Sequence, residues 1–218
     1  MKMNLFNTRK KVFNLVIVDE SGSMSTIHHQ AFSGMNETLS SVRAMQLRYP
    51  ETDQRITLVT FNSSHTTCLL DNVPALDTRE LPSSAYNPSG CTPLYDAIGR
   101  AVTKLEAQVE ACDARANVLV TIITDGEENS SREWRLSMIR ALIERLKSKG
   151  WTFALIGTDN LDVQSMAAEM SIDEHLKFCQ DAEGTDEMFR RERRARERFV
   201  ECTCCNTIMP SGHLFDEG

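Results

Sequence analysis

The chain has 218 residues, of which 41% are hydrophobic and 25% are charged, and its formal net charge is −7. These values fit one large α/β domain, or one domain with a small appendage, of ordinary soluble composition. The acidic balance gives no general attraction to phosphate backbones or anionic membranes, so neither nucleic acid nor a membrane is an expected partner.

Four apolar segments have the pattern of buried parallel strands, because they are short, continuous and rich in β-branched residues. They cover residues 12–18, 55–61, 117–124 and 151–158. A less regular segment over 65–70 follows a short polar turn, which predicts a hairpin with an antiparallel edge strand. A brief strand near 175–179 completes the predicted sheet.

Apolar residues at helical spacing predict helices between these strands. The expected helical faces are Phe32, Met35, Leu39, Val42 and Tyr49; Leu94, Ile98, Val102, Leu105 and Val109; and Trp134, Met138, Leu142 and Leu146. Pro50 closes the first helix, Pro93 lies in the first turn of the second, and Gly150 ends the third. A short helix is expected over 161–170, and residues 72–92 form a long loop, which is usually functional.

The alternation of strands and helices predicts an α/β fold with a doubly wound, mostly parallel central sheet and one antiparallel edge strand. We assign residues 1–183 to this domain and residues 184–218 to an Arg-rich helix with a cysteine-containing tail. The N-terminal sequence is not a signal peptide, and no segment approaches the ~20 apolar residues of a membrane span. The 7 cysteines, an odd number, are typical of free thiols, so we expect a cytoplasmic protein.

Polar side chains follow two of the predicted strands, where ligands bind in such a fold. Asp19, Ser21 and Ser23 follow the first strand, and Asp125 follows the strand over 117–124. Thr92 precedes a helix on a loop that can fold over the same edge. Carboxylate and hydroxyl oxygens suit Mg²⁺, Mn²⁺ or Ca²⁺ and suit zinc or copper poorly. Two carboxylates balance one divalent ion, so an open coordination position would attract an external carboxylate.

These segments resemble the metal-ion-dependent adhesion site of von Willebrand factor A domains, written Asp-x-Ser-x-Ser, then Thr, then Asp. The matching stretches are "DESGSM", "GCTPLYDAI" and "TDGEEN", within a resemblance that spans roughly residues 10–180. The resemblance implies a Rossmann-like fold and Mg²⁺ held by Asp19, Ser21, Ser23, Thr92 and Asp125. It also implies a non-catalytic module, of the cytosolic bacterial type, that captures an Asp or Glu of a protein partner. The partner implied is an AAA+ ATPase or a stress-response complex.

An enzyme is the alternative, namely a Mg²⁺-dependent hydrolase or phosphotransferase that uses Asp19. Against it, the chain has no Gly-x-x-x-x-Gly-Lys-Ser/Thr loop and no Gly-x-Ser-x-Gly motif. No Lys or Arg lies within the three loops to hold a phosphate, Arg132 being the nearest in sequence.

Other polar residues near these loops have simpler interpretations. We expect Glu20, Glu127 and Glu128 to be surface charge, with Glu20 directed away from the metal. His28 and His29 are expected to be exposed or to cap a helix.

The C-terminal segment "FRRERRARERF" (189–199) predicts a solvated helix docked on the domain, capped by Thr185 and packed through Met188, Ala195 and Phe199. A docking helix for a protein partner and a patch that binds an anion or nucleic acid are the alternatives. Cys202, Cys204, Cys205 and His213 do not have the spacing of a common zinc module, so we expect reduced thiols in a loosely ordered tail.

Overall fold

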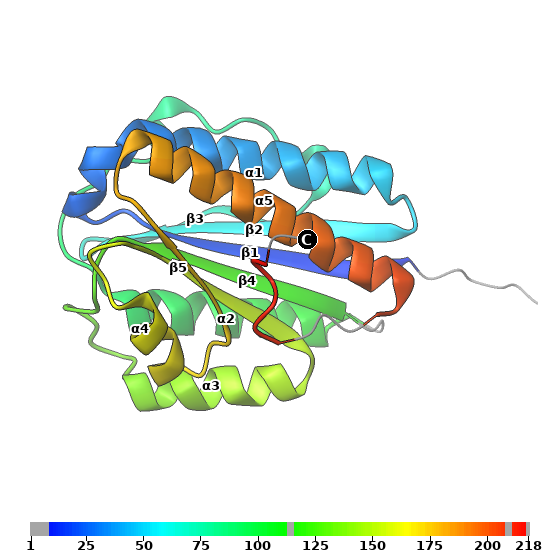
Figure 1. The fold of residues 1–218 in the computed structure, drawn as a ribbon. Helices are drawn as coiled ribbons and strands as arrows, with labels where there is room; N and C mark the ends of the chain where they lie inside the picture. The colour runs from blue at the N-terminus through cyan, green and yellow to red at the C-terminus, as the bar shows by residue number, and fades with distance from the viewer. Residues whose placement is uncertain (1–8, 113–115, 208–210, 217–218) are drawn as a thin grey trace, which may run out of the picture.

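A six-stranded sheet forms the centre of the computed structural model, which describes residues 9–112, 116–207 and 211–216 (Figure 1). The strands are β1 (Lys10–Asp19), β2 (Thr52–Phe61), β3 (Thr66–Pro74), β4 (Ala116–Thr124), β5 (Trp151–Thr158) and β6 (Glu174–Phe178). Their order is β3-β2-β1-β4-β5-β6, and every neighbouring pair is parallel except β2 with β3. The predicted doubly wound sheet with one antiparallel edge strand is therefore confirmed.

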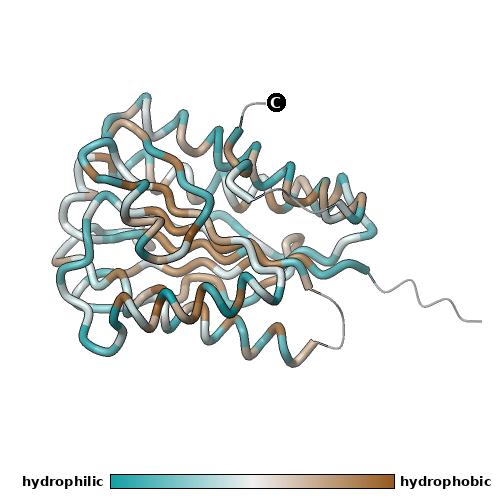
Figure 2. Tube along the Cα trace, turned by 60° about the horizontal axis from the view of Figure 1, so that its bottom comes forward, coloured by the Kyte–Doolittle hydropathy of each residue, from teal (hydrophilic) through white to brown (hydrophobic). Residues whose placement is uncertain are grey.

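Helices cover both faces of this sheet. One face carries α1 (His28–Arg48) and α5 (Ala182–Cys205), and the other carries α2 (Leu94–Glu110), α3 (Leu136–Ser148) and α4 (Val163–Glu169) (Figure 1). Short 3₁₀ helices cover Gly22–Ile27, Ala75–Asp77 and Ser83–Ala85. Each face has its own apolar core, and Figure 2 shows the hydrophobic strands enclosed between the helical layers. No helix in the described part of the chain is both long and apolar enough to cross a membrane.

The central position of β1 and β4 explains their composition. Both strands are buried along almost their whole length, because helices lie on each face and strands on each side. This environment selects the continuous Val, Ile and Leu runs seen in the sequence. From β1 the chain turns to β2 on one side, and it later returns to β4 on the other. The carboxyl ends of β1 and β4 therefore form the switch point at which ligands bind in open α/β sheets.

Three sequence expectations around the helices are wrong. Trp134 precedes α3 because its backbone N–H, with those of Arg132 and Glu133, donates to the carboxylate of Asp96. Met138 is 44% exposed, since the buried face of α3 begins one residue later. That face consists of Ile139, Leu142, Ile143 and Leu146. Pro93 is the residue before α2, not part of its first turn.

The C-terminal helix also differs from the prediction at both ends. α5 is capped by Asp181, whose side chain accepts a hydrogen bond from the Gly184 N–H at 2.7 Å, and not by Thr185. Its last turn contains the three cysteines, Cys202, Cys204 and Cys205, which we had expected in a loose tail. Lys10 donates to the carbonyls of Thr203 and Cys204 in the last turn of the helix, where a cation is favourable. Residues 208–210 and 217–218 of the predicted tail lie outside the described residues.

Gly34 allows α1 and α5 to pack closely. A Cβ atom built on Gly34 would overlap the ring of Phe189 on α5. We expect Gly34→Ala to lower the free energy of unfolding by about 1–3 kcal/mol despite its better helix propensity, because the overlap forces the helices apart. Urea denaturation measures this. Glu37→Ala on the exposed face of α1 is the control, and equal stabilities of the two variants would refute the close packing.

Candidate metal centre

The predicted site residues lie on loops at the switch point of the sheet. Asp19 is the last residue of β1, and Asp125 directly follows β4. Ser21 and Ser23 lie at the start of the 3₁₀ helix that leads into α1, and Thr92 lies two residues before α2. Asp19 and Asp125 reach one edge of the sheet because β1 and β4 are neighbours, and the segment before α2 brings Thr92 to the same edge.

The turn after β1 is fixed by hydrogen bonds to the Asp19 side chain. Its Oδ1 accepts a bond of 2.7 Å from the Ser21 N–H, and its Oδ2 accepts one of 2.6 Å from the Thr124 hydroxyl. The Tyr86 hydroxyl donates to the Asp19 carbonyl at 2.7 Å. Asp19 is fully buried, so its carboxylate has one conformation that the surrounding groups define.

Two serine hydroxyls meet the second carboxylate. Ser23 Oγ donates to Asp125 Oδ1 at 2.8 Å, and Ser21 Oγ lies 3.5 Å from the same oxygen. The two hydroxyl oxygens are 3.2 Å apart. The alternating Ser-x-Ser spacing therefore places both hydroxyls on one side of the turn, facing Asp125.

Thr92 lies beside this cluster on the third loop. A Cβ atom built on Gly126 would lie 3.1 Å from the Thr92 hydroxyl oxygen, so this hydroxyl is next to the residue that follows Asp125. The Thr92 backbone exchanges hydrogen bonds with Asn129 at 2.9 and 3.1 Å. The Gly22 N–H donates to the Gly90 carbonyl at 3.0 Å and joins the first and third loops. All five predicted residues are thus gathered at one place.

The two carboxylates of the cluster are poorly solvated. Burial raises the pKa of Asp19 to about 6, although hydrogen bonds from Thr124 and Ser21 oppose this rise. Burial also raises the pKa of Asp125, against hydrogen bonds from Ser23 and Gln180. Desolvation penalises both charges in the metal-free protein, and a cation bound between them would relieve that penalty.

The donor set fits a hard divalent cation. No ion pair within residues 9–112, 116–207 and 211–216 involves Asp19 or Asp125. Buried carboxylates are normally paired or bound to a metal, so their missing counter-charge favours a cation. The same described residues contain no group of three or more His, Cys, Asp or Glu side chains placed to hold a metal. Two carboxylates with hydroxyls suit Mg²⁺ rather than zinc.

The expectation that Glu20 is surface charge is wrong, because its side chain is only 2% exposed. Its carboxylate accepts a hydrogen bond from the Asn87 N–H at 2.5 Å and lies 3.3 Å from His65 Nε2. Its carbonyl accepts a bond of 2.9 Å from the Ser89 N–H. Glu20 therefore fastens the first loop to the β2–β3 turn and to the segment that leads to Thr92.

Of the remaining polar residues near the site, one differs from the expected exposure and three agree with it. Glu128 is half-buried and accepts hydrogen bonds from Ser131 and from the Tyr95 N–H, so it shapes the loop after β4 and is not simple surface charge. Glu127 is exposed as predicted, and so are His28 and His29. His28 stacks on Tyr86 and contacts its carbonyl at 2.9 Å, which supports the segment beside Asp19.

Two residues that hold the carboxylates were missed in the sequence. Thr124 bonds Asp19 from the neighbouring strand, and its position just before Asp125 was an available signal. Gln180, on the loop between β6 and α5, donates from Nε2 to Asp125 Oδ2 at 2.7 Å and to Thr26 Oγ1 at 3.3 Å. Nothing local in the sequence marks Gln180, because its role arises only when β6 is placed in the sheet.

Comparison with known proteins gives one family and a set of similar structures. The family model of the von Willebrand factor type A domain matches residues 15–191, which is more than half of the chain. A search of curated proteins found no match.

Solved structures share the fold at low sequence identity. The VWA domain of SpRpn10 aligns at 13% identity with a TM-score of 0.57, covering 83% of this chain and 94% of that chain. The vWF domain of the type V pili tip protein Mfa5 from Porphyromonas gingivalis aligns at 11% identity with a TM-score of 0.58, covering 84% and 95%. Proximal thread matrix protein 1 from the mussel byssus aligns at 12% identity with a TM-score of 0.56 over 88% of this chain. This chain covers 46% of that protein, less than half of its length.

Proposed function

Because the chain belongs to the von Willebrand factor type A domain family, we propose that it is a metal-dependent protein-binding module without catalytic activity. Domains of this family commonly mediate protein–protein interactions. The proposed cation is Mg²⁺, with Mn²⁺ or Ca²⁺ as alternatives, and the proposed ligands are Asp19, Ser21, Ser23, Thr92 and Asp125. The partner supplies an Asp or Glu side chain to the bound metal.

One observation carries this proposal. Two buried carboxylates without a basic partner in the described part of the chain meet two serine hydroxyls at the switch point, with Thr92 alongside. Asp19 and Asp125 would hold the cation, and the neutral hydroxyls would orient it without adding charge. The ion would then keep its Lewis acidity toward a carboxylate from outside. Ser23 is exposed, so the site is accessible from solvent.

The enzyme alternative receives no support from the geometry. Both oxygens of Asp19 already accept hydrogen bonds, and the side chain is fully buried, which disfavours attack on a substrate. Arg132, the basic residue nearest in sequence to the three loops, is exposed on the segment between β4 and α3. The proposal needs no nucleophile, since ligand exchange at the metal is the only chemistry.

A pull-down tests the proposed binding mode. The immobilised chain is incubated with native lysate in Mg²⁺ or in EDTA, and bound proteins are identified by mass spectrometry. We expect a partner that is retained only with Mg²⁺ and is lost with Thr92→Ala. Asp77→Ala is the control, because Asp77 is exposed and follows β3 at the opposite edge of the sheet. Recovery of the same proteins in both buffers would contradict metal-dependent capture.

Metal affinity should depend on pH through Asp19. Its pKa is about 6 in the metal-free protein, and a metal ligand must be deprotonated. We therefore expect Mg²⁺ affinity to fall about tenfold between pH 7 and pH 5, because a proton competes for the carboxylate below its pKa. Isothermal titration calorimetry at the two pH values measures this. Equal affinities would show that Asp19 does not contribute its charge to the site.

The proposed setting is the cytoplasm, with an AAA+ ATPase or a stress-response complex as the class of partner. The seven free cysteines, which are typical of a reducing compartment, support the setting, and the resemblance to the von Willebrand factor A family supports the class of partner. Mass spectrometry of the Mg²⁺-dependent fraction identifies the partner directly.

A further inference from the structure

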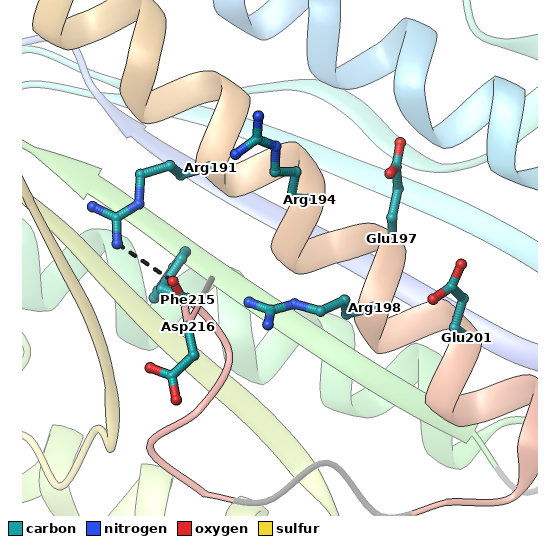
Figure 3. A pocket seen from close by; sticks show the side chains of 7 residues that line it. All are labelled: Arg191, Arg194, Glu197, Arg198, Glu201, Phe215 and Asp216. Carbon is teal, nitrogen blue, oxygen red and sulfur yellow. Dashed lines mark hydrogen bonds between the residues drawn. The ribbon is translucent and has the colours of Figure 1, made fainter. Parts of the chain in front are cut away.

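A pocket of about 400 Å³ lies between α5 and the C-terminal segment 211–216, apart from the proposed metal centre (Figure 3). It is lined by Arg191, Arg194, Glu197, Arg198, Glu201, Phe215 and Asp216. This volume is typical of sites that bind small molecules. Neither the family nor the proposed function accounts for three arginines at one pocket.

The arginines project from one side of α5. Arg191, Arg194 and Arg198 are spaced i, i+3 and i+7, so they follow one another along a single helix face. Arg191 donates to the Phe215 carbonyl at 3.3 Å, and Arg198 donates to the Leu214 carbonyl at 2.5 Å. Figure 3 shows these two guanidinium groups directed toward the C-terminal segment from either side. The pocket is therefore preorganised, because the protein fixes two of its three cations.

These guanidinium groups keep unused hydrogen-bond donors. A guanidinium has five N–H donors, and Arg191 and Arg198 each make one hydrogen bond to the described residues. A ligand with several acceptor oxygens would bond the terminal N–H groups that these two arginines leave unused.

The charge balance of the pocket favours an anion. Glu201 accepts a hydrogen bond from Tyr49 at 2.7 Å and lies 3.4 Å from Arg48. Asp216 pairs with His213 at 2.5 Å. Two of the three acids that line the pocket thus have partners of their own.

The charges of the three lining arginines are not paired with acidic residues in the same way. Within the described residues, Arg191, Arg194 and Arg198 form no ion pair. Of the lining acids, Glu201 pairs with Arg48, and Glu197 and Asp216 are left to offset three guanidinium charges, since a neutral His213 does not cancel the charge of Asp216. The pocket therefore carries a surplus of positive charge.

We propose that this pocket binds a small molecule that carries a phosphate or another multiply charged oxyanion group. The planar guanidinium fork matches such groups through paired hydrogen bonds. Phe215 offers an apolar wall for the rest of the ligand. A pocket of about 400 Å³ admits a small anion and not an extended polyanion such as nucleic acid. A bound anion also links the arginines that hold Leu214 and Phe215, and so it fixes the C-terminal segment on α5.

Arg194 and Arg193 provide a matched pair for the test. Both are exposed arginines on α5, but only Arg194 lines the pocket. Neither makes a hydrogen bond to another residue in the described part of the chain, unlike Arg191 and Arg198. Arg194→Gln therefore changes the ligand site without releasing the C-terminal segment, and Arg193→Gln controls for loss of one surface charge.

The full chain is stripped of metal with EDTA and dialysed into EDTA-free buffer, and pyrophosphate is then titrated by calorimetry at constant ionic strength. Removal of the metal keeps the metal centre out of the measurement, so the result is independent of the proposed function. We expect saturable binding that Arg194→Gln weakens about tenfold or more and that Arg193→Gln leaves within about twofold. Parallel titrations with phosphate and citrate distinguish a phosphate ligand from a polycarboxylate ligand. Absence of saturable binding of all three anions, or equal weakening by both variants, would overturn the proposal.

Discussion

Asp19→Asn should abolish Mg²⁺ binding, with at least about a 100-fold loss of affinity, and should eliminate metal-dependent partner capture. The amide keeps the shape of the side chain and removes the charge that would hold the cation. In the metal-free protein, by contrast, the same change should stabilise the fold. Burial raises the pKa of Asp19 from 3.8 to about 6, so ionisation of this residue costs the folded state roughly 3 kcal/mol at pH 8.

The sign of this effect follows from proton binding. Between pH 3.8 and about 6, the folded protein holds a proton on Asp19 that the unfolded chain has released. The stability of the metal-free protein therefore falls as the pH rises through this window. Asn does not titrate, but it has one acceptor oxygen fewer than Asp. We therefore expect Asp19→Asn to raise the free energy of unfolding of the metal-free protein at pH 8 by about 1–3 kcal/mol.

A crossover in stability is the expected result. In EDTA at pH 8, Asp19→Asn unfolds at higher urea concentration than the wild type, and in saturating Mg²⁺ the order reverses. Asp77→Asn, at an exposed position, should follow the wild type in both buffers. If Mg²⁺ raised the stability of Asp19→Asn and of the wild type equally, Asp19 would not be a metal ligand.

Arg196→Met should lower the free energy of unfolding by about 3–5 kcal/mol. Arg196 is fully buried on α5, where it pairs with Glu192 and donates to Asn14 at 2.7 Å and Thr121 at 3.1 Å. These two partners belong to β1 and β4, so the arginine fastens the helix to the centre of the sheet. Its removal leaves the 3%-exposed Glu192 as a buried charge without its cation.

A double variant separates the lost ion pair from lost packing. Arg196→Met with Glu192→Gln removes both charges, and we expect it to recover a large part of the stability that the single variant loses. Urea denaturation of the two variants and the wild type measures this. A single variant within about 1 kcal/mol of the wild type would show that the buried pair does not hold α5 on the sheet.

The central strands were predictable because a strand covered by helices on both faces needs a continuous apolar sequence. The continuous apolar run over 117–124 fits a strand covered on both faces, and β4 spans Ala116–Thr124. Helical spacing predicted the start and the buried face of α3 incorrectly, because Trp134 and Met138 continue the four-residue repeat of Leu142 and Leu146 without lying on that face. The loop before α3 donates three backbone N–H groups to the Asp96 carboxylate, which sets where the helix begins, and such a long-range contact leaves no periodic signal.

The candidate site was predictable to the extent that its residues follow strands directly. Asp19 ends β1 and Asp125 directly follows the neighbouring β4, so the sheet order brings them together. The contacts of Gln180 and Glu20 depend on loops whose paths are set by tertiary contacts, and no local pattern indicates them. The division into residues 1–183 and 184–218 stays a prediction, and residues 1–8 of the first range lie outside the described part of the chain.

The most direct measurement of the central claim is anomalous diffraction from crystals grown with Mn²⁺. The account predicts one strong peak among the oxygens of Asp19, Ser21, Ser23, Thr92 and Asp125, with metal–oxygen distances of about 2.1–2.3 Å and one position open to water or a carboxylate. A second crystal of Asp19→Asn should lack the peak. A wild-type crystal with full Mn²⁺ occupancy elsewhere and none at this switch point would contradict the account.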